Sequence, residues 1–471
     1  MTKSLFILIT LSLLITEPSY SKQKPNILFV YIDDMGYGDL GCYGNKEAQT
    51  PNIDKLATDG LRFNQFYVNA PICSPSRVAV TTGQYPSRWG INTIVASRSL
   101  NKERGVKDCL SLNAPSVARE LSANGYYTAH IGKWHMGGGR DIGDVPLITE
   151  YGFNESVTQF EGLGERYLAT YETLDLGGDS TRNLEKWSAA LGKGEIHWEK
   201  RYNITGKFVD RAILAIENAK KANRPFYINL WPDDVHTPLE PSHLNRGDGH
   251  QHDHFNGVLK ELDFELGRIF DYIRNNKELA ENTLIVVSSD NGPEIGVGSA
   301  GQLRGCKTNI YEGGIREPFI VWYPSKISKV RNGSVNTNNV IVAMDLPPTF
   351  LSLAGVKKHQ IKFDGLDISN IILGSDYSER KQPVMWQRPT DHNIKKGIDF
   401  PDLAIRHGNY KLLINTDGSG AELYNITQDE SEKINLAGKF PEIETILKDK
   451  LFAWYAECHQ LLNNENIQKK Q

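Results

Sequence analysis

The sequence predicts an α/β protein: a large, doubly wound and mostly parallel sheet flanked by helices, plus a small C-terminal antiparallel sheet with one helix. Three observations predict this. Apolar runs rich in β-branched residues alternate with segments of helical periodicity over most of the chain. These runs are nearly continuous, as expected for strands that are covered on both faces. After about Ser375 the pattern changes to short alternating runs separated by glycines.

The large sheet is predicted from five apolar runs. The expected strands span residues 24–32, 127–131, 226–231, 284–288 and 319–322, and the expected helices span 114–123, 208–222 and 255–275. In doubly wound sheets, ligands bind outside the carboxyl ends of the strands. The polar residues that follow the strands are therefore site candidates, namely Asp33, Lys133, His135, His236 and Asp290.

The C-terminal part is predicted as a separate small unit. Its strands are expected at 384–387, 403–407, 410–415 and 421–425, and its helix at 441–457. This divides the chain into a leader at 1–21, a large domain at 22–374 and a C-terminal subdomain at 375–471. The segment 326–339, rich in Asn, Ser and Gly, predicts a surface loop.

The N-terminus resembles a secretory signal peptide. Lys3 precedes an apolar run from Leu5 to Ile15, and Ser19-Tyr20-Ser21 forms a small-x-small cleavage pattern. The run is shorter than the about 20 residues that span a bilayer, so we predict no membrane span and a periplasmic or secreted protein. A retained amphiphilic anchor is the alternative.

Charge and cysteine content narrow the functional classes. Lys and Arg number 53 against 57 Asp and Glu, a net charge of −4. No basic excess exists to attract nucleic acid, and an anionic ligand must be held locally. Five cysteines are an odd and sparse set that fits neither a disulfide scaffold nor a zinc motif: Cys42, Cys73, Cys109, Cys306 and Cys458.

Two strand ends predict a metal site. Asp33 and Asp34 are adjacent, and two neighbouring carboxylates repel each other unless a cation lies between them. Asp290 and Asn291 follow another predicted strand and would add oxygen ligands at the same edge. Such hard donors favour Ca²⁺ or Mg²⁺ over zinc.

The segment around Cys73 predicts an anion-binding helix start. Pro75 suits the first turn of a helix running through Thr81, which places Cys73 at its N-terminus. Arg77 lies four residues further on and projects from the same face. An inert cysteine beside a structural arginine is the alternative that this motif alone leaves open.

The segment Cys73-Ser74-Pro75-Ser76-Arg77, with Thr82-Gly83 after it, resembles the signature of the formylglycine-dependent sulfatases. In that family a maturating enzyme oxidises the cysteine to formylglycine (3-oxoalanine). The resemblance covers residues 26–354 and, in a small second domain, 405–436, and it implies an alkaline-phosphatase-like fold. It continues at Asp33-Asp34, Lys133-Trp134-His135, His236, Asp290-Asn291-Gly292, Lys307 and Glu312-Gly313-Gly314-Ile315-Arg316.

The resemblance implies a hydrolytic mechanism. Hydrated formylglycine at position 73 attacks sulfur with one hydroxyl, the alcohol leaves, and the second hydroxyl then loses its proton and expels sulfate. Lys133 and Lys307 bind sulfate oxygens, and Arg77 orients the formylglycine. His135 assists deprotonation and His236 is the proton donor. The implied Ca²⁺ ligands are Asp33, Asp34, residue 73, Asp290 and Asn291.

The resemblance also points to a sulfated carbohydrate as substrate, such as an algal polysaccharide like ulvan or a glycosaminoglycan. We expect Arg388, Asp391 and His392, just after a C-terminal strand, to contact the glycan, a solvated turn being the alternative. His250, His252 and His254 are expected in a solvated loop. Two other functions remain open: a phosphodiesterase or phosphonate hydrolase, and a catalytically silent glycan-binding protein with unoxidised Cys73.

Overall fold

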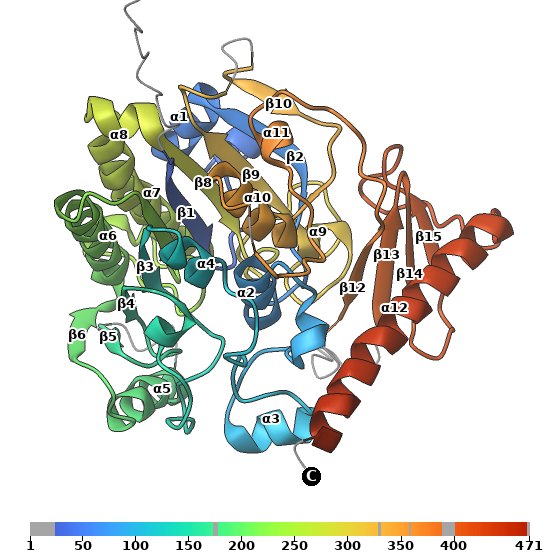
Figure 1. The fold of residues 1–471 in the computed structure, drawn as a ribbon, viewed down its shortest axis with the longest axis horizontal. Helices are drawn as coiled ribbons and strands as arrows, with labels where there is room; N and C mark the ends of the chain where they lie inside the picture. The colour runs from blue at the N-terminus through green and yellow to red at the C-terminus, as the bar shows by residue number, and fades with distance from the viewer. Residues whose placement is uncertain (1–23, 173–177, 328–330, 358, 389–400, 469–471) are drawn as a thin grey trace, which may run out of the picture.

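The computed structural model describes residues 24–172, 178–327, 331–357, 359–388 and 401–468, with only the backbone described at 178–182 and 461–468 (Figure 1). A large α/β unit fills most of the molecule. A smaller sheet with the long helix α12 (Pro441–Gln468) lies at one side of it.

Eleven strands of the described chain form one sheet, which confirms the predicted α/β class. All pairings are parallel except those of β9 with β2 and with β8. The order is β10 (Ser334–Asn336), β2 (Leu61–Tyr67), β9 (Arg316–Trp322), β8 (Thr283–Ser289), β1 (Asn26–Ile32), β7 (Phe226–Trp231), β3 (Tyr127–Gly132), β4 (Glu155–Thr158), β5 (Glu165–Thr170) and β6 (Ile196–Lys200); β11 (Ile341–Val342) also pairs with β2.

Helices cover both faces of the sheet, so the central strands are buried on both sides. In β1, Phe29 and Tyr31 join one apolar core, whereas Leu28 and Val30 join the other, because successive side chains point to opposite faces. The first core includes residues of α2 (Cys73–Thr82), α4 (Val117–Ala123) and α10 (Leu346–Leu353). The second includes residues of α1 (Pro51–Asp59), α6 (Ile204–Lys221) and α7 (Gln251–Arg274).

Two local expectations were wrong. The predicted surface loop 326–339 contains β10, which pairs in parallel with β2 through Ser334 and Asn336. Backbone hydrogen bonds make this short strand, so it needs no apolar pattern. The histidines expected in a solvated loop lie at the start of α7, where His254 is buried within the helix.

The small C-terminal sheet is antiparallel, as predicted, in the order β12 (Val384–Gln387), β13 (Leu403–His407), β14 (Tyr410–Ile414) and β15 (Glu422–Asn425). Helix α12 crosses the sheet (Figure 1) and buries Leu447, Leu451 and Trp454. It continues to Gln468, beyond the expected end at 457.

A buried lysine joins the two sheets. Lys411 in β14 donates a hydrogen bond to Glu312 Oε1 (2.9 Å), and both side chains have no exposed area. Glu312 begins α9 (Glu312–Ile315), and its other oxygen accepts a 2.6 Å hydrogen bond from Tyr67 in β2. Glu432 Oε1 lies 2.9 Å from the Lys411 ammonium on the C-terminal side. The small sheet is thus tied ionically to the large one.

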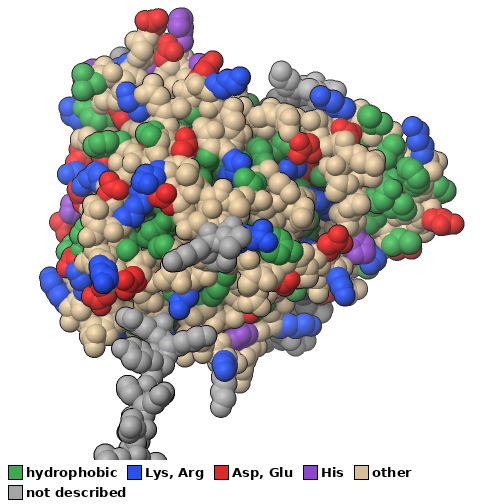
Figure 2. All heavy atoms as spheres, turned by 90° about the horizontal axis from the view of Figure 1, so that it is seen from above, with side chains coloured by type: hydrophobic (Ala, Val, Ile, Leu, Met, Phe, Trp, Pro, Cys, Tyr) green, Lys and Arg blue, Asp and Glu red, His purple; other side chains and the backbone are tan. Residues whose placement is uncertain are grey.

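Charges of both signs are interspersed on the face shown in Figure 2, consistent with the near balance of charge in the sequence. All five cysteines are free. Within the described ranges, every helix is too short or too polar to cross a membrane.

Candidate active site

The site begins where β1 and β8 end. The two strands pair in parallel up to Ile32 and Ser289, so the residues that follow them emerge at the same edge of the sheet. Asp290 N donates to Ile32 O (3.1 Å), and Asp290 Oδ1 accepts from the backbone N–H of Asp34 (3.2 Å). The sheet therefore brings Asp33, Asp34 and Asp290 together, and all three side chains are buried.

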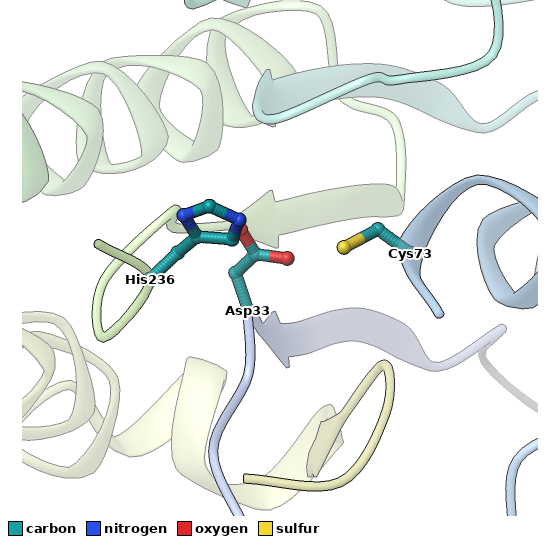
Figure 3. Close-up of side chains that lie close together, drawn as sticks. All are labelled: Asp33, Cys73 and His236. Carbon is teal, nitrogen blue, oxygen red and sulfur yellow. The ribbon is translucent and has the colours of Figure 1, made fainter. Parts of the chain in front are cut away.

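Cys73 approaches these carboxylates from the first position of α2, where its side chain points toward Asp33, as does that of His236 (Figure 3). Its sulfur lies 3.8 Å from both Asp34 Oδ1 and Lys133 Nζ. Burial, with the charge of Asp33, raises the pKa of the Cys73 thiol well above its ordinary value. The encoded thiol is therefore protonated and poorly nucleophilic.

Arg77 fixes the carboxylates from one turn further along α2. Its Nη2 lies 2.9 Å from Asp33 Oδ1 and 2.6 Å from Asp290 Oδ2, and its Nη1 donates to Lys133 O (2.9 Å). The guanidinium has no exposed area and lies 5.4 Å from the Trp231 ring centroid. Arg77 thus joins the ends of β1, β3 and β8.

The donor set fits a hard divalent cation. Asp33, Asp34, Cys73 and Asp290 offer atoms that all lie within 4.8 Å of one another. Burial raises the pKa of Asp34 to about 6 and, with the charge of Asp33, that of Asp290 to about 8. Asn291 Nδ2 donates to Asp34 Oδ1 (2.7 Å), while its buried Oδ1 has no hydrogen-bond partner among the described residues. A cation here would gain that oxygen and favour ionised carboxylates.

Two buried lysines complete the charge of the site. Lys133 Nζ donates to Asp33 Oδ2 (2.6 Å), and Lys307 Nζ pairs with Asp34 Oδ2. Although burial alone would lower it, the charge of Asp33 holds the pKa of Lys133 well above its ordinary value. Asp34 has the same effect on the pKa of Lys307. Both ammonium groups therefore carry a full positive charge beside Cys73.

His135 lies beside an acidic residue that the sequence did not indicate. Its Nδ1 lies 3.0 Å from Glu161 Oε2, and the same carboxylate lies 3.5 Å from Lys133 Nζ and 3.1 Å from Arg140 Nη2. Burial lowers the pKa of His135 to about 4, so the ring is neutral near pH 7. Glu161 lies in the loop between β4 and β5 and belongs to no motif that we recognised.

His236 is the most accessible of these groups, with 32% of its side chain exposed. Its Nε2 lies 3.6 Å from Asp34 Oδ2 and its Nδ1 lies 3.8 Å from Glu294 Oε2. Glu294 also accepts from the backbone N–H of Thr237 (3.0 Å). Although burial alone would raise it, the charges of His236 and Lys307 hold the pKa of Glu294 at about 2. Glu294 is a second neighbour that the sequence analysis missed.

A cavity of about 400 Å³ opens onto this cluster, a volume suited to a small ligand. Asp33, Cys73, Lys133, His135, His236 and Lys307 all line it. Arg388 is not among the described lining residues; its Nε donates to Pro401 O (3.1 Å) and its Nη2 to Asp402 (3.3 Å). Asp391 and His392 lie outside the described residues.

The backbone of the site is unusual at three positions. Asp34, His135 and Thr308 have φ values of 59°, 52° and 75°, in the left-handed region that non-glycine residues rarely adopt. Such conformations cluster at functional sites. Gly292 has a different constraint: a Cβ added there would lie 2.3 Å from Gly313 O. The turn after Asp290 therefore needs glycine for close backbone approach.

The fold and the site together define an α/β protein with an oxygen-rich candidate cation site beside a cysteine and two lysines. The Sulfatase family model matches residues 25–356, and a model of the N-sulphoglucosamine sulphohydrolase C-terminal region matches 306–456. The chain belongs to the sulfatase family and is a sulfuric ester hydrolase.

Curated relatives and solved structures support the assignment to the sulfatase family. Human arylsulfatase A is 30% identical over 95% of this chain and 89% of its own length. N-acetylgalactosamine-6-sulfatase of Canis lupus familiaris is 31% identical over 78% of this chain and 69% of its own length. The crystal structure of Ps i-CgsB in complex with k-i-k-neocarrahexaose superposes with a TM-score of 0.76 at 28% identity, covering 92% of this chain and 93% of that one.

Proposed function

We propose that the protein removes sulfate from a sulfated carbohydrate, using formylglycine made from Cys73 by a maturating enzyme and a bound Ca²⁺. The single observation that carries this is the juxtaposition of Cys73 with buried carboxylates and two buried ammonium groups in one cavity. We choose Ca²⁺ over Mg²⁺ because the cluster offers several protein oxygens, whereas Mg²⁺ usually keeps several waters and takes only one or two carboxylates.

Asp33, Asp34, residue 73, Asp290 and Asn291 would hold the cation. Bound there, the ion would supply Lewis-acid stabilisation of negative charge. Formylglycine would supply, as its hydrate, a nucleophile with a second hydroxyl, which the protonated thiol of Cys73 lacks.

Lys133 and Lys307 bind the sulfate oxygens in this proposal. Both ammonium groups pair with the carboxylates of Asp33 and Asp34 at the cavity wall. A cation bound by those carboxylates would compete for them and free ammonium hydrogens for the substrate. Fixed positive charge in a buried site stabilises the charge that develops on the sulfate oxygens. Arg77 stays paired with Asp33 and Asp290 and orients residue 73.

The two histidines move protons in opposite directions. His135 is neutral and lines the cavity, so it can accept a proton from residue 73, with Glu161 orienting its ring. His236 lies at the more exposed part of the site between Asp34 and Glu294. We assign it the donation of a proton to the oxygen of the leaving alcohol.

The carbohydrate substrate is supported by the relatives. N-acetylgalactosamine-6-sulfatase is named for a sulfated sugar, and Ps i-CgsB was solved with a carrageenan-type hexasaccharide. An algal polysaccharide such as ulvan or a glycosaminoglycan remains our proposal for this chain. Arg388, Asp391 and His392 are retained as proposed glycan contacts. The signal peptide at 1–21, the periplasmic or secreted location and the domain limits at 22–374 and 375–471 also remain predictions.

The test compares nitrophenyl sulfate with nitrophenyl phosphate, using protein produced with a maturating enzyme. We expect sulfate hydrolysis to dominate; preference for phosphate would favour the phosphodiesterase alternative. In the active preparation, the peptide containing position 73 should be lighter by about 18 Da, because the thiol becomes an aldehyde. An unmodified thiol in fully active protein would contradict the mechanism. Cys73→Ser is the matched inactive control.

A further inference from the structure

Part of the cavity wall takes no role in sulfate chemistry. Arg201 and Asp233 line the same 400 Å³ cavity as Cys73 and His236, together with the half-buried aromatic residues Phe160 and Tyr171. Arg201 precedes α6, and Asp233 follows β7 in the loop that also carries His236. This wall is therefore built by the same sheet edge that builds the active site.

The arginine is held rigidly. Its Nη2 lies 2.7 Å from Asp234 Oδ1, and the other oxygen of Asp234 accepts a 2.5 Å hydrogen bond from Thr205 in α6. Asp233 Oδ2 lies 3.5 Å from the same Nη2. Only 4% of the Arg201 side chain is exposed. A guanidinium held in this way presents its remaining donors in a defined direction.

One donor and one acceptor on this wall are unmatched. Arg201 Nη1 and Asp233 Oδ1 are shielded from solvent and have no hydrogen-bond partner among the described residues. Buried polar groups in folded proteins are nearly always paired. Because Arg201 and Asp233 also line the cavity, a side-chain adjustment on binding would let a ligand pair with both atoms. The ligand must accept one hydrogen bond and donate another.

The charge of the wall selects the chemistry of that ligand. Asp233 and Asp234 together outweigh the single positive charge of Arg201. A carboxylate or second sulfate at this part of the wall would therefore find the charge of Arg201 already neutralised, whereas two neutral hydroxyls need no free positive charge. Adjacent hydroxyls of a pyranose can accept from Arg201 and donate to Asp233, while Phe160 and Tyr171 offer apolar surface to the ring.

We propose that Arg201 and Asp233 form the subsite that recognises two adjacent free hydroxyls on the sulfated sugar ring. The inference rests on the proposed sulfatase function and adds a substrate class to it: a neutral sugar ring bearing one sulfate and a vicinal diol. A uronic acid or a disulfated ring in this position is disfavoured.

The test measures kcat/KM of the mature enzyme on nitrophenyl sulfate, which has no diol, and on the 6-sulfates of galactose, N-acetylgalactosamine and N-acetylglucosamine. The variants are Arg201→Lys and Asp233→Asn, the second being isosteric. Arg211→Lys and Asp210→Asn are the matched controls, because those residues form ion pairs with Glu165 and Arg268 and do not line the cavity.

We expect each subsite variant to lose at least about tenfold in kcat/KM on the preferred sugar sulfate, equal to about 1.4 kcal/mol, and less than about twofold on nitrophenyl sulfate. The control variants should match the wild type on both. A deoxy analogue that lacks one hydroxyl of the diol should abolish the difference between wild type and variant, since the two losses share one interaction.

Three outcomes would overturn the proposal. Equal losses on both kinds of substrate would show a structural role, and no loss on either would show no role. A wild type that cleaves nitrophenyl sulfate but no sugar sulfate would contradict the proposed subsite without contradicting the sulfatase function. A wild type that cleaves no sulfate ester would overturn the proposed function itself. If Arg201→Lys fails to fold, Asp233→Asn alone decides.

Discussion

A buried histidine in the core predicts a measurable acid sensitivity of the fold. His130 in β3 is fully buried, and its ring centroid lies 4.9 Å from that of Trp231, 5.0 Å from that of Trp134 and 5.5 Å from that of Phe153. Burial, with the charge of Arg77, lowers the pKa of His130 to about 3. In the unfolded chain the pKa of histidine is about 6.5.

The direction in which pH changes the free energy of unfolding follows from proton binding. Between these two pKa values the unfolded state binds the proton and the folded state does not, so the free energy of unfolding falls as pH falls. The stabilising contribution is complete above pH 6.5 and is lost progressively toward pH 3. At about 1.4 kcal/mol per pH unit, lowering the pH from 7.5 to 4.5 should cost about 2 to 3 kcal/mol through His130 alone.

The perturbation is His130→Phe, which keeps a planar ring among the aromatic neighbours and removes the titration. Urea unfolding followed by tryptophan fluorescence at pH 7.5, 6.5, 5.5 and 4.5 gives the free energy of unfolding of variant and wild type. We expect the variant to lose about 2 to 3 kcal/mol less over this range. His252→Phe, at an exposed position, should follow the wild type. Parallel curves for His130→Phe and wild type would refute the reasoning.

Three further predictions concern the site and its support. Asp290→Asn should abolish activity and remove the proposed calcium ion, measured by elemental analysis, because it deletes a buried carboxylate from the cluster; retained calcium would contradict the proposed ligand set. Glu161→Gln should lower kcat on nitrophenyl sulfate about 10- to 100-fold by releasing His135, with KM little changed; an unchanged kcat would exclude a positioning role. Lys411→Met should destabilise the protein by about 3 to 5 kcal/mol in urea unfolding, since it leaves Glu312 buried without its ammonium partner; a loss below about 1 kcal/mol would show that the bridge is dispensable.

The sequence was most informative where a local rule determines a spatial result. Parallel strands end at the same edge of a sheet, so Asp33 and Asp290 could be placed together although they are far apart in the chain. The apolar runs also gave the class of the fold. Two strands with weaker sequence patterns were not predicted: β2 includes the polar residues Arg62 and Asn64, and β10 has only three residues. Strands of this kind depend on backbone pairing with neighbours, here β10 and β11 on one side of β2 and β9 on the other, which the sequence does not reveal.

The supporting residues of the site could not be predicted for a related reason. Glu161 and Glu294 lie in loops, and nothing in their local sequence distinguishes them from solvent-exposed acids. Their importance arises only from the folded contacts, with His135 for the first and with Thr237 and His236 for the second. Arg201 is similar, because a buried guanidinium next to the cavity looks in sequence like any surface arginine.

The ion pair between Lys411 and Glu312 affects whether the C-terminal sheet can be removed from this enzyme. Glu312 opens the turn whose next residues, Gly313 and Gly314, touch Gly292, and Gly292 N donates to Gly314 O (3.1 Å). Removing the C-terminal strands would therefore take away the Lys411 ammonium that pairs with the buried Glu312 carboxylate. Glu312 lies two residues from Gly314, whose backbone supports the turn that carries Asp290 and Asn291. We therefore expect a proteolytic cut or a shortened gene product that spares every cavity residue to lower activity, because the turn that carries Asp290 and Asn291 is supported from another sheet.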